Sequence, residues 1–75
     1  MSATLLPPQV RLANEIARQF AHRPPADAAT AIANHIRAVW DPRMKKALLE
    51  AVDAGNEDLD PVAALAAEQL RPAAQ

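Results

Sequence analysis

The sequence predicts an all-α fold, a small array of about four short helices, and three observations support this prediction. Seven prolines and one glycine divide the 75 residues into short segments, and both residue types interrupt regular secondary structure. Within each segment apolar residues recur at intervals of three and four, which is typical of a helix with one buried face. The sequence has no stretch in which apolar and polar residues alternate as they do in a half-buried strand. We expect a single helical domain over residues 1–75, with frayed ends at about 1–6 and 72–75.

The first helix is expected to open at Pro7-Pro8, because the fixed φ of proline suits the first helical turn. Arg23-Pro24-Pro25 ends the run, and His22 falls in the expected last turn, where a cation suits the helix dipole. The predicted buried stripe is Val10, Ala13, Ile16, Ala17 and Phe20.

The second helix is expected to begin with Asp27 as its N-cap, since Asp is among the preferred capping residues. It ends at Asp41-Pro42, because a residue that precedes proline avoids the helical region. Its predicted buried stripe is Ala29, Ile32, Ala33, Ile36, Val39 and Trp40.

The third helix begins at the same dipeptide, since Asp41 suits the N-cap and Pro42 the first helical position. Gly55 is the expected left-handed stop. The predicted stripe is Met44, Ala47, Leu48, Ala51 and Val52.

The fourth helix repeats this device after an acidic loop, with Asp60 as cap and Pro61 as opening residue. Arg71-Pro72 ends it. The predicted stripe is Val62, Leu65, Ala66 and Leu70.

The composition predicts a small core and a soluble chain without cofactor. Hydrophobic residues make up 51% of the chain, but many are alanine, so we expect marginal stability alone and stabilisation by a partner. The absence of cysteine excludes disulfides, iron–sulfur clusters and thiolate metal sites. A net charge of −1 disfavours a nucleic-acid partner. No apolar run approaches the roughly 20 residues of a membrane span, and the N-terminus lacks signal-peptide features, so we expect a cytoplasmic location.

The residue types that carry catalysis or bind metals are sparse and isolated. His22 and His35 have no companion ligands at metal-site spacing. The carboxylates Glu57, Asp58 and Asp60 lack the spacing of a calcium loop, and the only serine is Ser2. We therefore predict that the chain has no catalytic, cofactor-binding or metal-binding residues and is not an enzyme on its own.

One stretch breaks a local rule and is the best candidate for partner binding. Arg43, Lys45 and Lys46 lie in the first turn of the third helix, whereas Glu50 and Asp53 lie near its end. This order is the reverse of the one that the helix dipole favours. Asp41 offsets it only partly, as a cap and as a partner of Lys45 four residues on.

Two further residues, Trp40 and Asn14, allow two interpretations each. Trp40 either packs in the core between the second and third helices or anchors an interface. Asn14 either docks against another backbone or lies at the solvent boundary. His35 lies at the edge of the second stripe. The predicted partner-binding residues are Trp40, Asp41, Pro42, Arg43, Met44, Lys45, Lys46, Asn14 and His35.

Three segments together resemble a known family. They are VRLANEIARQFA (10–21), IANHIRAVWDPRMKKALLE (32–50) and LDPVAALAAEQL (59–70), and WDPRM is the most specific part. In this order and spacing they resemble the delta subunit of soluble NAD-dependent formate dehydrogenases. The sequence departs from the common family pattern at Leu12, Glu15 and Val39, and in the loop 56–58, where the family has a glycine-rich turn.

The resemblance implies a non-catalytic accessory subunit that supports assembly or stability of the large subunit in a cytoplasmic complex. It also implies an alpha subunit with a molybdenum or tungsten bis-pyranopterin and iron–sulfur clusters. The implied beta and gamma subunits carry FMN and further clusters and pass electrons to NAD⁺. The alternative is a free-standing helical adaptor or chaperone that binds the apo-enzyme transiently. A DNA-binding regulator is disfavoured by the charge.

Overall fold

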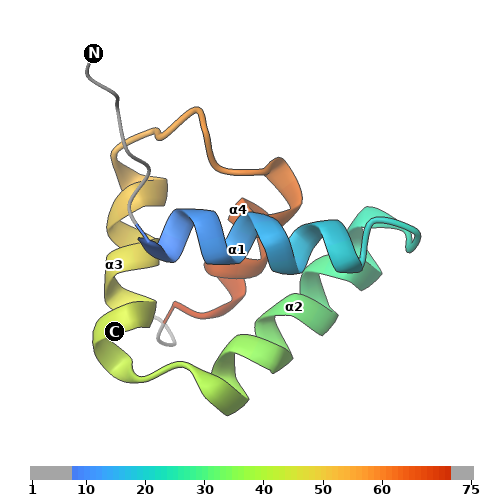
Figure 1. Cartoon of the computed structure of the whole chain (residues 1–75), viewed down its shortest axis with the longest axis horizontal. Helices are drawn as coiled ribbons and strands as arrows, with labels where there is room; N and C mark the ends of the chain where they lie inside the picture. The colour runs from blue at the N-terminus through green and yellow to red at the C-terminus, as the bar shows by residue number, and fades with distance from the viewer. Residues whose placement is uncertain (1–7, 72–75) are drawn as a thin grey trace.

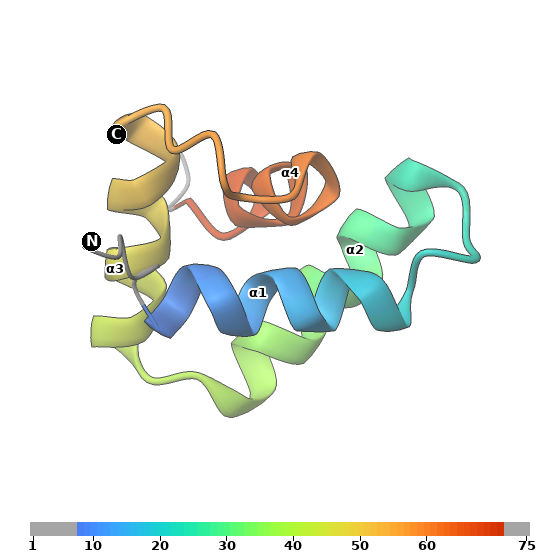
Figure 2. The ribbon, with the colours of Figure 1, turned by 45° about the horizontal axis from the view of Figure 1, so that its top comes forward.

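The computed structural model describes residues 8–71 of the chain, and this part is built from four helices without a strand. They are α1 (Pro8–Gln19), α2 (Pro25–Val39), α3 (Pro42–Asp53) and α4 (Pro61–Gln69). Helices α2 and α4 form the most extensive helix pair. Helix α3 stands at one end of the molecule, across the N-terminal end of α1 (Figures 1 and 2). The all-α prediction is confirmed, while the predicted frayed ends lie outside the described residues.

The local signals at α3 and α4 are confirmed by the hydrogen bonds that begin and end these helices. The Asp41 carboxylate accepts from the N–H of Met44 at 2.9 Å, and that of Asp60 accepts from the N–H of Val62 at 2.8 Å. Gly55 has a φ of 73°, the left-handed conformation that ends a helix. The loop after it lets the chain reverse into α4.

Two expectations about α1 and α2 are wrong. Helix α2 begins at Pro25, so Asp27 lies inside its first turn and no side chain caps this helix. The cause is Pro25, whose fixed φ starts the helix before Asp27 is reached. Helix α1 ends at Gln19, so His22 lies beyond its last turn, in a series of tight turns from Phe20 to Arg23.

The core is formed mainly by small side chains. Fourteen apolar residues of the described part are buried, and eight of them are alanines. The three buried residues of α4 are all alanines (Ala63, Ala66 and Ala67). Because their side chains are small, α2 and α4 can approach closely. The larger buried residues are Val10, Ile32, Ile36, Trp40, Leu48 and Leu59.

Two residues of the predicted stripes are exposed. Val39 is 61% exposed and Leu65 is 50% exposed. Helix α4 turns its alanine face to the core and leaves Leu65 outside it, and Val39 is the last residue of α2. Helical spacing alone does not show which apolar residues face the neighbouring helices.

Candidate functional site

The turn between α2 and α3 is fixed by backbone geometry and by one large side chain. Trp40 is extended, and its N–H donates to the carbonyl of Ile36 at 2.8 Å. Asp41 is also extended, as the residue before a proline must be. The side chain of Trp40 is only 7% exposed and belongs to the core cluster. The structure therefore supports the core interpretation of Trp40.

The residues that follow this turn form the basic end of α3. Arg43 and Lys46 are exposed, whereas Met44 and Lys45 are half-buried. The carboxylate of Asp41 is used as the N-cap, and the expected ion pair between Asp41 and Lys45 is not formed. Within residues 8–71, the three cations at this end make no ion pair.

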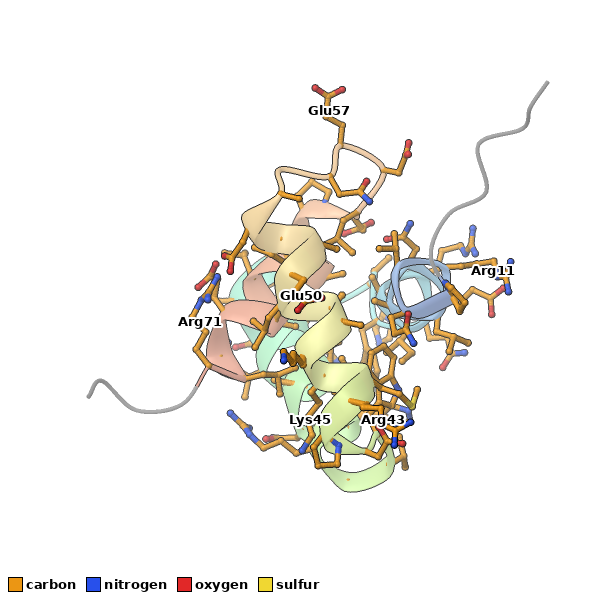
Figure 3. The ribbon with its side chains drawn as sticks, turned by 90° about the vertical axis from the view of Figure 1, so that its left-hand side faces the viewer. Arg11, Arg43, Lys45, Glu50, Glu57 and Arg71 are labelled. Carbon is orange, nitrogen blue, oxygen red and sulfur yellow. The ribbon has the colours of Figure 1, made fainter. Side chains whose placement is uncertain are left out.

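Arg43, Lys46 and Glu50 lie on one side of α3, and we call these three residues the outer face of α3. Their spacing of three and four residues places them in line along the helix, and all three are exposed. Figure 3 shows α3 nearest the viewer, with Arg43 and Lys45 toward one end of the helix, Glu50 further along it and Glu57 beyond its opposite end. The charge along this face thus changes from positive to negative in the direction of the chain.

The carboxylate of Asp53, the last residue of α3, is paired, in contrast to the cations at the start of this helix. The guanidinium of Arg71 binds the carboxylates of both Asp53 and Glu68, and its Nε lies 2.6 Å from Glu68 Oε1. The hydrogen bond from Arg71 lowers the pKa of Glu68, and the same contacts raise the pKa of Arg71. Asp53 and Arg71 are 18 residues apart, and no local sequence signal points to this pair.

Asn14 joins α1 to the loop that precedes α4. Its Oδ1 accepts from the N–H of Asp60 at 2.7 Å, and its Nδ2 donates to the carbonyl of Asp58 at 2.8 Å. The first interpretation of Asn14, docking against another backbone, therefore holds within the chain itself. The expectation that it merely lies at the solvent boundary is wrong, because both ends of its amide are used.

The other side chains of interest are not brought together. His35 is exposed on α2 and His22 is exposed after α1. Across residues 8–71, no three acidic or histidine side chains lie close enough to hold a metal ion. A shallow open hollow on α1 is lined by Glu15, Arg18 and Gln19. Among the same residues, no helix has the length and apolar character needed to cross a membrane.

A comparison with known families and proteins adds one match. The family described as NADH-dependent formate dehydrogenase delta subunit FdsD matches residues 9–67 of the 75 residues. The matched segment includes all of α2 and α3, the outer face of α3 and both Asp-Pro helix starts. No curated protein and no solved structure matches the chain.

Proposed function

The chain belongs to the family of NADH-dependent formate dehydrogenase delta subunits, and from this we propose that it is a non-catalytic accessory subunit of such a complex. In this role it supports the assembly or stability of the large subunit that carries the cofactors. Membership of the family indicates which enzyme complex the chain belongs to. The features of the chain itself favour a supporting role in that complex.

The observation that carries the proposal is the alanine-rich core. Alanine adds little buried apolar area, and burial contributes only about 25 cal/mol per Å² removed from water. With eight alanines among fourteen buried apolar residues, a chain of this size gains little from its own core. Binding to a larger subunit stabilises the folded form by mass action. A partner-dependent fold is what an accessory subunit needs.

The environment of the polar side chains supports a non-catalytic role. Catalytic acids and bases commonly work in partly desolvated clefts that shift their pKa values. In residues 8–71 every buried side chain is apolar. The polar groups of this part instead cap helices, join loops or face solvent.

The cofactors of the complex are assigned by this proposal to the other subunits. The chain contains no cysteine that could bind an iron–sulfur cluster, so its residues do not fit such a group. We therefore place molybdenum or tungsten bis-pyranopterin, iron–sulfur clusters and FMN in the alpha, beta and gamma subunits, and the complex in the cytoplasm.

Co-purification tests the proposal directly. The full-length chain is co-expressed with the other subunits, the large subunit is isolated through a tag, and the amount of the chain per large subunit is measured. We expect a fixed stoichiometry in the mature, cofactor-loaded enzyme. A chain that is found only with cofactor-free large subunit is a transient chaperone instead, and a chain that is found with neither form contradicts both functions.

The isolated chain gives a second measurement of the same proposal. We expect it to be helical, to unfold in a broad thermal transition and to become more stable within the complex. Circular dichroism of the isolated chain and hydrogen exchange in both states measure this difference. A sharp transition at high temperature in a proven monomer would contradict dependence on a partner.

A further inference from the structure

We propose that the outer face of α3 (Arg43, Lys46 and Glu50) docks on a surface of another subunit that presents carboxylates to the two cations and a cation to Glu50. This inference rests on the proposed function, because it requires that the chain remains bound within a complex. It specifies the surface and the chemistry of the partner.

The geometry makes this face available as one continuous strip. The three side chains follow one another at intervals of three and four residues on one side of the helix, and each is exposed. Helix α3 contacts α1 and α4 with its opposite side, where Leu48 is fully buried. No other helix lies in front of α3 in Figure 3. A partner can therefore contact the strip without displacing any described element.

The order of the charges argues against a role in the stability of the chain alone. Cations near the start of a helix and an anion toward its end have the order that the helix dipole disfavours. Within the described residues no ion pair compensates Arg43 or Lys46. Carboxylates on a partner would compensate them in the complex.

The ion pair of Asp53 shows that a charge on the same helix can be neutralised by another residue of the chain. Asp53 is bound by Arg71, which also binds Glu68. Three residues earlier, Glu50 has no such contact with another described residue. The outer face is thus left with both signs of charge unpaired, in a fixed order that can match only one direction of a partner surface.

A charge-exchanged variant separates binding from folding. It carries Arg43→Glu, Lys46→Glu and Glu50→Lys in the full-length chain, co-expressed with the other subunits. The matched control carries Arg11→Glu, Arg18→Glu and Glu15→Lys on the exposed side of α1, with the same change of net charge. We expect retention on the large subunit to fall at least tenfold for the outer-face variant and to stay at the wild-type level for the control.

The melting temperature of the isolated outer-face variant distinguishes this loss from unfolding. It should equal or exceed that of the wild type, because the exchanged charges now follow the order that the dipole favours. A second variant, Arg43→Gln with Lys46→Gln, should be retained severalfold less than wild type, with a weaker dependence on salt. This neutral variant keeps the test valid if the exchanged chain does not fold.

Retention of both outer-face variants at the wild-type level overturns the proposal, and so does an equal loss in the control variant. In either case the wild-type chain still co-purifies, and the accessory function stands without this face. If the wild-type chain itself does not co-purify, the proposed function fails first, and the docking surface fails with it.

Discussion

Helices α3 and α4 begin with the same dipeptide, and an aspartate carboxylate caps each of them, yet the two helix starts have different surroundings. The start of α4 is tied to α1, because the Asn14 amide accepts from the N–H of Asp60 and donates to the carbonyl of Asp58. It is followed by apolar residues that face the core. The start of α3 follows the buried side chain of Trp40 and carries three cations without an ion pair in the described part.

The difference shows that the capping motif determines where a helix begins but not what its first turn does. At α4 the first turn belongs to the fold, and its polar groups are satisfied within the chain. At α3 the chain provides the Asp41 cap and the buried Trp40, but it provides no ion pair within residues 8–71 for the three cations that follow. We therefore expect substitutions around α4 to change stability alone, and substitutions on the outer face of α3 to change association.

The largest effect is expected at the apolar support of α3. Trp40→Ala removes a buried aromatic side chain and should destabilise the chain by about 3–5 kcal/mol, as truncation of buried aromatic residues does. Urea denaturation followed by circular dichroism measures this, and a chain of low stability should lose most of its helical signal. The control is Val39→Ala at the neighbouring position. Val39 is 61% exposed, so its truncation should reduce stability little. Similar effects of the two substitutions would show that Trp40 is not part of the core.

The next effect concerns the connection between α1 and the start of α4. Asn14→Ala leaves the N–H of Asp60 and the carbonyl of Asp58 without their partner, which should cost about 1–3 kcal/mol. Asn14→Asp should cost at least as much, because its carboxylate still accepts from the N–H of Asp60 but places an oxygen against the carbonyl of Asp58 and adds a negative charge beside two aspartates. Urea titration ranks the three chains, and equal stability of all three would contradict the structural role of Asn14.

Features that depend on a few neighbouring residues could be predicted from the sequence. The caps at Asp41 and Asp60 and the left-handed Gly55 follow from rules that act within one turn of helix. The all-α fold follows from helical spacing together with the positions of proline. Even Asp27 was a reasonable cap by residue type, and the expectation failed only because Pro25 begins the helix earlier.

Features that depend on contacts between distant segments could not be predicted. Leu65 is exposed because α4 presents alanines to α2, and this choice depends on how closely the two helices pack. Asn14 contacts residues 44 and 46 positions away. The order of the charges on α3 is visible in the sequence as a broken rule, but only the structure shows that, within residues 8–71, Asp53 is paired while Glu50 is not.

The smallest effect is also the most direct test of the comparison between the two helix starts. Asp41→Asn and Asp60→Asn both keep a good N-cap, because Asn caps about as well as Asp, but each removes a negative charge. At Asp60 no charged residue lies in the first turn of α4, so only the favourable contact of a charge with the dipole is lost, about 0.3–1 kcal/mol. At Asp41 the substitution also removes the carboxylate that directly precedes the three cations, so the loss should be larger at low salt and should shrink as salt screens the repulsion among them. Thermal melts of both variants at low and high salt measure the difference. If the two variants respond to salt in the same way, the cations of α3 do not oppose one another in the free chain, and the reason to seek their compensation in a partner disappears.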